Sequence, residues 1–470
     1  MVTGSPELFL HFDRSRPRGR RAQVEQGLRE AIRSGRLVPG ARLPSSRALA
    51  DDLGVTRGLV VTVYEQLSAE GYLVSRQGSG TVVSPQVVPA GSQRPAATVA
   101  ADQRLSFTPA HPDLSLFPRR AWSRAFRSAW LTLPDDALGY GDPLGLPVLR
   151  SALADYLGRV RGVACEPEQV VICSGLGQAF ELVARTLTRL GHEAVGLEDP
   201  GDRHLAPLVE REGLAAVPVS VDDEGLRVDR LEASGCRAVV VTPANQFPIG
   251  VVLSPERRHR LCEWARRCDG YVLEDDCEAE FRHDRQPIGA LQGLAPDHVV
   301  YFGATWQSLA PGLRIGWFVV PPQLADMLAS VGVAPAALTS AILQATFAEF
   351  LARGDLDRHL RTVRKTYARR RDALLDAIER WFPDARTTGV AAGLHVLVML
   401  PDGMDAERIA IEAKARGIEV ETLAAFRADR NGHPAGLVLG YASLTPSQIH
   451  DGIEQLAKTA CSVADQKWSP

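Results

Sequence analysis

Lysine is scarce in this chain of 470 residues, and none occurs before Lys365. Only four positions carry it, so arginine supplies nearly all of the positive charge. No apolar run approaches the roughly 18 residues that a membrane-spanning helix needs, and the first residues lack the basic and apolar regions of a signal peptide. We therefore expect a cytoplasmic protein with no lysine amine for covalent chemistry in its first 364 residues.

The seven cysteines are odd in number and scattered, with no C-x-x-C pair. This pattern is typical of reduced cysteines in a cytoplasmic protein, and it excludes a disulfide framework and a zinc site. The histidines His11, His111, His204 and His395 show no metal-ligand spacing either. We expect no metal ion.

Charge is unevenly distributed along the chain. Residues 1–84 contain twelve arginines and eight acidic residues, a net charge of +4, which leaves −7 for the remainder because the whole chain carries −3. A basic block on an acidic body suggests an anionic partner for the block. The length is sufficient for two or three domains.

Three short helices followed by a hairpin are predicted in the first block. Apolar residues recur at helical spacing over 24–32, 49–53 and 59–67. Glycine ends or separates these helices, and serine or threonine precedes the second and the third. Residues 72–74 and 81–83 are predicted to be two strands joined across a glycine-containing turn. This is the order of elements in a winged helix-turn-helix.

The block resembles the GntR family of transcription regulators, because the ordered pattern P-G-x-x-L-P-S-x-R-x-L-A-x-x-L-G-V-x-R runs from Pro39 to Arg57. The resemblance implies that the third helix enters the major groove of double-stranded DNA, where Arg57 can donate two hydrogen bonds to guanine. Helix caps and wing residues suit phosphate and minor-groove contacts. The alternative is that the arginines form a solvated surface of a small helical domain. The residues expected to contact DNA are Arg42, Ser45, Ser46, Arg47, Thr56, Arg57, Gly58, Gly78, Ser79, Gly80 and Thr81.

We assign residues 15–84 to the DNA-binding domain and 85–104 to a linker, because the latter segment is rich in proline, alanine and serine without periodicity. From residue 105 to 460, strand-like runs alternate with helical stretches. This alternation favours an α/β domain with a mainly parallel sheet covered on both faces. The strand at 216–219 is the least secure, because Pro218 cannot donate to a ladder.

The body is expected to have two lobes. We expect a larger lobe to comprise residues of about 140–321, and a smaller α+β lobe to comprise about 322–460 together with 105–139. The other predicted strands of the body are 169–173, 194–197, 238–242, 271–273, 299–302, 315–320 and 394–399.

The stretch 299–317 begins as a β-branched and aromatic strand and passes through a loop of small residues to Pro-Gly-Leu-Arg-Ile-Gly. It resembles the cofactor-lysine loop of fold-type-I pyridoxal 5'-phosphate (PLP) enzymes, and more closely that of the aminotransferase-like domain of MocR-type regulators. The register of residues 309–314 places Gln307 at the position of the lysine. A Schiff base needs a primary amine, and a glutamine amide cannot provide one.

Further motifs of the MocR body occur in order over nearly all of the large region. The resemblance implies that Asp275 pairs with the pyridinium nitrogen and that Arg314 binds the phosphate. It also implies that Tyr140 approaches the phosphate from the partner subunit. The backbone N–H groups at the start of one helix could hold the phosphate as well. Asp275 and Arg314 could instead pair for purely structural reasons. The retained positions are Tyr140, Ser174, Gly175, Gly177, Asp275 and Arg314.

Four other positions of this pocket depart from the family pattern. Cys277 replaces the tyrosine that hydrogen-bonds the cofactor's 3-hydroxyl, and Asp202 replaces the aromatic residue that packs on the pyridine ring. Ala304 replaces a hydroxyl beside the phosphate, and Asn245 replaces a histidine. These departures, together with the lost lysine, indicate a vestigial cofactor pocket.

The sequence therefore predicts a homodimeric, DNA-binding transcription regulator whose aminotransferase-like body senses a ligand or only dimerises. We expect no covalent cofactor, no catalytic residue and no enzyme activity. Head-to-tail dimers are expected, because fold-type-I sites are shared between subunits and two heads would read two half-sites. A regulator that senses PLP without covalent attachment is the alternative, and an active aminotransferase is disfavoured by Gln307.

Overall fold

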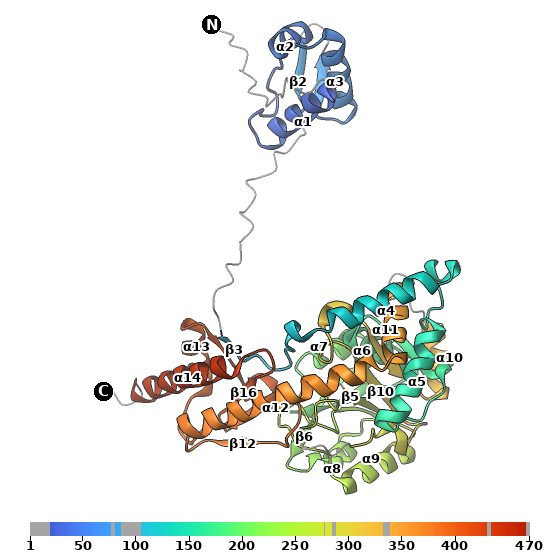
Figure 1. Cartoon of the computed structure of the whole chain (residues 1–470), viewed down its shortest axis with the longest axis vertical. Coiled ribbons are helices and arrows are strands. Elements are labelled where there is room, and N and C mark those ends of the chain that lie inside the picture. Colours follow the sequence, from blue (N-terminus) through green and yellow to red (C-terminus); the bar gives the residue numbers. More distant parts are fainter. Residues whose placement is uncertain are drawn as a thin grey trace. The chain divides into compact units, whose positions relative to one another are not determined.

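The computed structural model describes residues 19–76, 80–85, 105–276, 278–283, 288–331, 339–429 and 434–466. The chain divides into two compact units, Met1–Asp102 and Gln103–Pro470 (Figure 1). No helix in the described ranges is long and apolar enough to cross a membrane. Three predicted site residues, Gly78, Ser79 and Cys277, lie outside the described residues, as does all but Pro85 of the expected linker.

The N-terminal unit consists of three helices and an antiparallel hairpin, which confirms the elements predicted between residues 24 and 83. The apolar faces of the helices form one buried core with the hairpin. The helices are α1 (Arg20–Arg33), α2 (Ser46–Leu53) and α3 (Arg57–Ala69), and the strands are β1 (Leu73–Arg76) and β2 (Gly80–Val83).

The predicted helix caps of this unit are confirmed. At the start of α2, Ser45 accepts a hydrogen bond from the N–H of Ala48 at 3.2 Å. At the start of α3, Thr56 accepts one from the N–H of Leu59 at 3.4 Å. Gly54 ends α2 with a φ of 66°, a left-handed conformation that glycine adopts at little cost. These three residues define the turn between the two helices.

The body is built on an eight-stranded, mainly parallel sheet, as the alternation of strands and helices predicted. β11 runs antiparallel to both of its neighbours, and the short β7 runs antiparallel to β6, whereas the remaining pairs are parallel. In sheet order the strands are β4 (Val170–Cys173), β11 (Gly316–Val319), β10 (Val299–Ala304), β9 (Tyr271–Asp275), β8 (Ala238–Val241), β5 (Ala194–Asp199), β6 (Ala215–Asp222) and β7 (Gly225–Leu226).

Pro218 does not interrupt β6, although it made this strand the least secure of those predicted. Its neighbour β7 pairs only with Val221 and Asp222, so Pro218 faces no strand on that side. A proline is tolerated at such an edge because no ladder partner needs its missing N–H.

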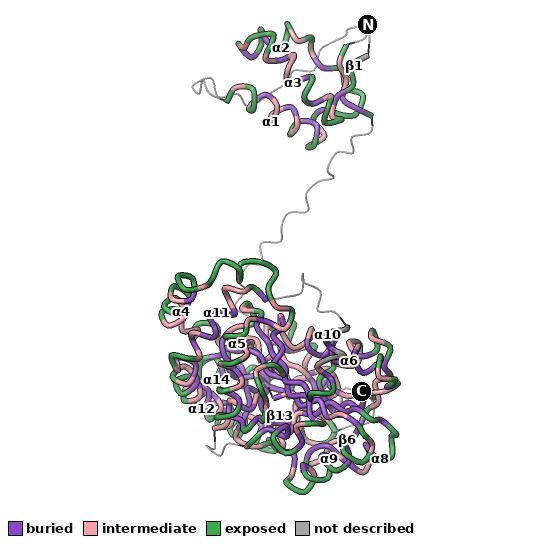
Figure 2. Tube along the Cα trace, turned by 90° about the vertical axis from the view of Figure 1, so that its right-hand side faces the viewer, coloured by how far each residue is buried: buried purple, intermediate pink, exposed green. Residues whose placement is uncertain are grey.

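Helices cover both faces of the sheet, and side chains alternate between the two sides along each strand. Val240 of β8 packs in one core with α6, while Val239 and Val241 pack on the opposite side with α8 and α9. Both faces are therefore buried, as the purple interior of the body in Figure 2 shows. The covering helices are α5 (Pro147–Arg161), α6 (Leu176–Arg189), α7 (Leu205–Arg211), α8 (Val228–Ser234) and α9 (Pro255–Cys268).

A smaller four-stranded antiparallel sheet lies near the C-terminus, and β14 pairs separately with β3. The order of the small sheet is β12 (Arg386–Thr388), β13 (His395–Met399), β16 (Gly436–Gly440) and β15 (Glu421–Thr422), and the separate pair is β14 (Ile418–Glu419) with β3 (Leu105–Ser106). The associated helices are α12 (Asp355–Trp381), α13 (Ala406–Ala415) and α14 (Pro446–Gln466).

The lobe boundaries predicted from the sequence stay predictions, but two helices outside the predicted larger lobe, α10 (Pro322–Val331) and α11 (Ala341–Ala352), contact its helices. α10 packs on α6, and α4 (Arg119–Thr132) packs on α11, which also contacts α5. The 3-10 helices are η1 (Leu114–Leu116), η2 (Asp135–Leu138), η3 (Pro167–Gln169), η4 (Gln292–Leu294), η5 (Pro311–Leu313) and η7 (Leu423–Phe426).

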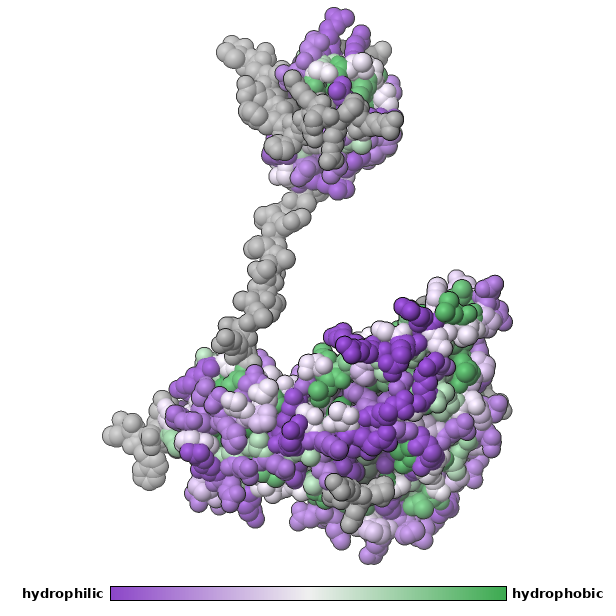
Figure 3. All heavy atoms as spheres, viewed as in Figure 1, coloured by the Kyte–Doolittle hydropathy of each residue, from purple (hydrophilic) through white to green (hydrophobic). Residues whose placement is uncertain are grey.

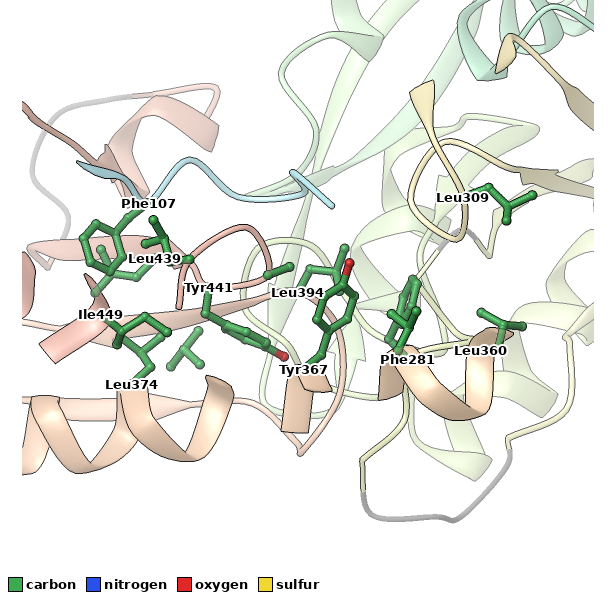
Figure 4. Packing of buried hydrophobic residues seen from close by; sticks show 14 of the residues in the cluster. Phe107, Phe281, Leu309, Leu360, Tyr367, Leu374, Leu394, Leu439, Tyr441 and Ile449 are labelled. Atoms are coloured by element: carbon green, nitrogen blue, oxygen red, sulfur yellow. The ribbon is translucent and has the colours of Figure 1, made fainter. Parts of the chain in front are cut away.

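One hydrophobic core connects the small sheet with the large one. Phe107 packs beside Leu439 at the small sheet, and Tyr441, Tyr367 and Phe281 continue the cluster toward the large sheet (Figure 4). The two sheets therefore form one body, and loops from both can contribute to a shared site.

Candidate functional site

A cavity of about 410 Å³ lies where four adjacent parallel strands of the large sheet end. Each strand, or the loop after it, supplies lining residues: Glu198 from β5, Asn245 after β8, Asp275 from β9 and Gln307 after β10. The carboxyl ends of parallel strands form a crevice in which α/β proteins commonly bind ligands. Segment 108–111 and part of the small lobe complete the wall.

The centre of the wall is a carboxylate held by two amides. Glu278 accepts a hydrogen bond from Nε2 of Gln307 at 2.9 Å and another from Nδ2 of Asn245 at 2.7 Å. His395 lies nearby, with its Nδ1 3.6 Å from the same carboxylate. Gly393 covers this group so closely that a Cβ there would lie 2.4 Å from Nδ2 of Asn245. We call Glu278, Asn245 and Gln307 the amide clamp.

The amide clamp leaves two buried acceptors. The residues Gln307 and Asn245 are 2% and 5% exposed. Within the described part of the chain, Oε1 of Gln307 and Oδ1 of Asn245 have no hydrogen-bond partner. Because Glu278 can only accept when ionised, it fixes which end of each amide faces it. The two amide oxygens must then point elsewhere.

Glu198 is a second buried carboxylate of the cavity. It accepts hydrogen bonds from the hydroxyl of Thr242 at 2.6 Å and from Nε2 of Gln246 at 3.2 Å. The pKa of the Glu198 carboxyl is raised to about 7, mainly by burial and also by the nearby Asp275, although the hydrogen bonds from Thr242 and Gln246 act in the opposite direction. Glu198 is therefore a proton-binding group near neutral pH.

An ion pair buried beside the cavity anchors the loop after β9. Arg161 at the end of α5 donates two hydrogen bonds to Asp276, at 2.7 and 2.9 Å, and Tyr301 donates a third at 2.8 Å. Bidentate pairing of this kind fixes both position and orientation. Asp276 is thereby neutralised, and the neighbouring Asp275 is held at the end of its strand.

The predicted phosphate-binding residues gather in a separate cluster near the carboxyl end of β4. A Cβ at Gly175, whose φ is 130°, would lie 3.9 Å from the guanidinium of Arg314. Ala304 and Cys173 flank Gly316 on neighbouring strands. These residues are not among those that line the cavity.

The Ser174 donors at this cluster are already used within the chain. Both its N–H and its hydroxyl donate to Oε1 of Gln178, at 2.7 and 2.9 Å. Gly177 lies in the first turn of α6. A phosphate at this place would depend on Arg314 and the glycine backbone.

The predicted pocket residues are thus divided in the structure. Asp202, Asn245, Asp275 and Gln307 line the cavity. Tyr140 is 86% exposed and does not line it. The positions at the separate cluster are Ser174, Gly175, Gly177, Ala304 and Arg314.

Several lining residues were missed by the sequence analysis. Glu278 follows the predicted Asp275 by three positions, so its place was a signal that could have been used. Glu198 likewise precedes the predicted Asp202 by four positions. Phe426 comes from the small lobe and Trp306 from the loop before Gln307, and only the fold shows that they line the cavity.

In the N-terminal unit, five of the predicted DNA-contacting residues line one groove of about 600 Å³. Tyr64 of α3 donates a hydrogen bond to the carbonyl of Pro44 at 2.9 Å and thereby joins α3 to the start of α2. Arg57 reaches across the helix-turn-helix to the hydroxyl of Ser46 at 3.4 Å. The five are Arg42, Ser45, Ser46, Gly80 and Thr81.

The other described candidates lie on the surface around this groove. Arg47, Thr56, Arg57 and Gly58 are exposed at the starts of α2 and α3. Arg42 extends beside Gly80 of the hairpin, since a Cβ there would lie 3.3 Å from its Nε. Cationic side chains therefore surround one continuous surface made by α2, α3 and the hairpin.

Two family models match the chain. Residues 20–83 match "Bacterial regulatory proteins, gntR family", and residues 113–456 match "Aminotransferase class I and II". Both matches fall within the compact units described above.

Relatives match over nearly the whole chain. It is 33% identical to the probable rhizopine catabolism regulatory protein MocR of Rhizobium meliloti, over 95% of each chain. It is 31% identical to the pyridoxine biosynthesis transcriptional regulator PdxR of Corynebacterium glutamicum, over 90% of this chain and 91% of that protein. Among solved structures, a kynurenine aminotransferase of Pyrococcus horikoshii in complex with PMP matches with a TM-score of 0.69 and 27% identity, over 79% of this chain and 93% of that one.

The raised pKa of Glu198 predicts a pH-dependent stability. Between about pH 4.5 and 7 the unfolded chain loses this proton while the folded chain keeps it, so the free energy of unfolding falls as the pH rises. Replacing Glu198 with glutamine removes this penalty and keeps an acceptor for Thr242. The gain in stability of Glu198→Gln over the unmodified protein should grow across that window, by up to about 3 kcal/mol.

Urea unfolding at a series of pH values measures this difference. Glu274, whose pKa is also raised to about 7, is unchanged in both proteins, so its effect cancels. Glu379→Gln, on the exposed surface of α12, is the matched control and should show no such trend. A difference for Glu198→Gln that stays constant with pH would contradict the prediction.

Proposed function

The chain belongs to the MocR-type GntR transcription regulators, in which a gntR-family DNA-binding domain is fused to an aminotransferase class I and II domain, and we propose that its body recognises an effector and dimerises without performing catalysis. The observation that carries this proposal is the amide clamp. Gln307 stands at the position where a Schiff base would need a lysine amine, and its amide donates a hydrogen bond to Glu278 instead. The protein would act on DNA in the cytoplasm.

The N-terminal groove supports a role in reading an operator. Ser45 and Thr56 fix the starts of α2 and α3, so that Arg47 and Arg57 extend from helix N-termini into solvent. Arginine on such a helix can donate two hydrogen bonds to the O6 and N7 atoms of guanine. Arg42 beside the hairpin suits a phosphate or minor-groove contact.

The body does not fit covalently attached PLP. Gln307 offers an amide whose donor is committed to Glu278, and an amide is no nucleophile toward an aldehyde. A further carboxylate, Asp202, lines the same cavity and would repel a phosphorylated anion. We infer a site without catalytic residues, in which Gln307 stands at the lysine position.

Non-covalent PLP sensing is the second candidate function. The observation that favours it is the Arg314 guanidinium next to the glycine backbone at 175, which is an arrangement suited to a phosphate. Asp275 would then face the pyridinium nitrogen. The N–H and the hydroxyl of Ser174 argue against this candidate, because both already donate hydrogen bonds to Gln178 and neither is available to a phosphate.

An exposed apolar surface supports a homodimer. On α4, Phe126 and Trp130 stack with ring centres 6.5 Å apart, and Leu131 is 76% exposed. Leu138 and Tyr140 follow in the chain and are 59% and 86% exposed. Figure 3 shows hydrophobic surface at the end of the body where α4 lies. Apolar side chains so exposed mark an interaction site, and we assign a second, head-to-tail copy to it.

The first prediction from this function concerns Arg57. Arg57→Ala should weaken binding to operators enriched from random DNA by about 1–3 kcal/mol and relax the base preference at one position of each half-site. Fluorescence anisotropy at fixed salt measures the affinity. The control is Arg36→Ala, an exposed arginine outside the predicted contacts, which should keep the base preference. Equal specificity for Arg57→Ala and the unmodified protein would rule out the major-groove role.

The second prediction concerns the cofactor. Titration of the unmodified protein with PLP should give no saturable heat, and borohydride reduction should leave no adduct at position 307. In Gln307→Lys, Glu278 would stabilise the ammonium, so a reducible adduct should form mainly as the pH is raised. Calorimetry and peptide mass mapping provide the measurements. Saturable heat without an adduct in the unmodified protein would favour the non-covalent sensor instead.

The third prediction concerns assembly. Leu131→Glu should shift the full-length protein from dimer toward monomer in sedimentation velocity runs, because a carboxylate would be buried against apolar surface. Leu294→Glu is the control, since Leu294 is an exposed leucine on η4, outside this surface. Unchanged sedimentation of Leu131→Glu would show that the dimer interface lies elsewhere.

A further inference from the structure

The first half of α12 concentrates positive charge on the body. Residues 358–371 contain six arginines and one lysine and no aspartate or glutamate, although the chain beyond residue 84 has a net charge of −7. The acidic residues of this helix lie before and after that stretch, at Asp355, Asp357, Asp372, Asp376 and Glu379. A basic segment therefore lies on an otherwise acidic body.

Three of these cations form a row along the outer side of α12. Arg361, Lys365 and Arg369 are exposed, whereas Val363 and Tyr367 on the opposite side are buried. Residues four positions apart lie on the same face of a helix, about 6 Å apart along its axis. We call the three exposed cations the basic row. Figure 3 shows strongly hydrophilic surface where α12 crosses the body in Figure 1.

The basic row is not neutralised by the rest of the body. Other exposed cations on its helices pair with a glutamate four residues earlier: Arg353 pairs with Glu349 at 2.6 Å, and Lys458 pairs in the same way on α14 at 2.7 Å. Among the described residues, no hydrogen bond or ion pair reaches a side chain of the basic row. Like charges at this spacing destabilise a helix. The stability of α12 therefore does not explain the row, and an anionic partner would offset its repulsion.

Duplex DNA is an anion whose spacing suits the row. Phosphates along one strand of B-DNA follow one another about every 3.4 Å of the helix axis. Cations about 6 Å apart therefore come close to the spacing of alternate phosphates. Arginine and lysine bind phosphates whatever the base sequence.

The N-terminal unit keeps DNA within reach of the row. This unit belongs to the gntR family of regulators and is joined to the body in one chain, so DNA that it holds is at a high effective concentration near the body. The twenty residues assigned to the linker can span at most about 70 Å. That is the length of about 20 base pairs of duplex.

We propose that the basic row binds the phosphate backbone of the DNA that flanks the operator, as a second contact that does not depend on base sequence. The inference goes beyond the proposed function, in which the body recognises an effector and dimerises and only the N-terminal unit meets DNA. It shares with that function the premise that the protein binds an operator. The affinity of the protein should then depend on the length of the DNA as well as on its sequence.

Operators of two lengths test the inference on the full-length protein. One duplex contains only the operator enriched from random DNA, and the other adds about 25 base pairs of arbitrary sequence on each side. In fluorescence anisotropy titrations at fixed salt, the flanked duplex should bind at least fivefold more tightly, whatever the flanking sequence. Equal affinity for the two duplexes would overturn the inference.

A triple variant of the basic row, Arg361→Gln with Lys365→Gln and Arg369→Gln, locates the contact. It should lose the gain from the flanks and keep its affinity for the short duplex. For the flanked duplex, the slope of log affinity against log salt should become shallower by about 2 to 3 units, since each phosphate contact contributes about 0.9. An unchanged gain in this variant would refute the assignment of the row.

The matched control changes the net charge of the body equally at scattered positions. It combines Arg211→Gln, Arg237→Gln and Arg386→Gln, three exposed arginines outside α12, and it should keep the gain from the flanks. A loss equal to that of the row variant would show an effect of net charge alone and overturn the inference. Arg361→Lys with Arg369→Lys keeps the charge of the row and should also keep the gain.

Arg57→Ala separates failure of this inference from failure of the proposed function. It should weaken binding to both duplexes and leave the gain from the flanks. If Arg57→Ala behaves so at the operator but the flanks add nothing, only the second contact is wrong. If no operator can be enriched, the regulator function fails, and random duplexes of the two lengths still test the row through its triple variant. Row-dependent binding to vesicles of anionic lipid, without row-dependent binding to duplex DNA, would assign the row to a membrane surface and overturn the inference.

Discussion

The site depends on the parallel arrangement of β5, β8, β9 and β10. Parallel strands direct their carboxyl ends to one edge of the sheet, so loops that are far apart in the sequence meet there. This constraint brings Glu198, Asn245, Glu278 and Gln307 into one wall, although more than a hundred residues separate the first from the last. The Arg161–Asp276 pair then holds the loop after β9 in place.

Glu278 determines the polarity of this wall. Its carboxylate orients the amides of Gln307 and Asn245 so that their donors face inward to it and their acceptors face away. Six carboxylates and one arginine, Arg203, are among the described residues that line this cavity. The close approach of Gly393 from the small lobe completes the enclosure, because any side chain there would collide with the amide of Asn245.

Local features of the chain could be predicted from the sequence with good accuracy. Ser45 and Thr56 cap their helices as expected, since capping depends on residues three positions apart. The strand order and the single antiparallel β11 among the central strands could not be derived in this way, because they depend on long-range packing. Phe426 lines the cavity for the same reason, since it comes from the other lobe.

The candidate site was predicted only in part. Motif positions grouped Asp275 and Gln307 with Arg314; the first two line the cavity, whereas Arg314 lies beside Gly175 and is not among the lining residues. From the sequence, Asn245 was one of several separate departures from the family pattern. In the structure its amide is a partner of Glu278, so two replacements that were counted separately belong to one hydrogen-bonded group.

This coupling has an evolutionary consequence. A single codon change from glutamine to lysine at 307 would place an ammonium against Glu278, where an ion pair keeps the amine protonated and unreactive. Changing Glu278 alone would leave two amides without their shared acceptor. Each change is therefore unfavourable without the other, so this pocket could gain a reactive amine only through two mutations together.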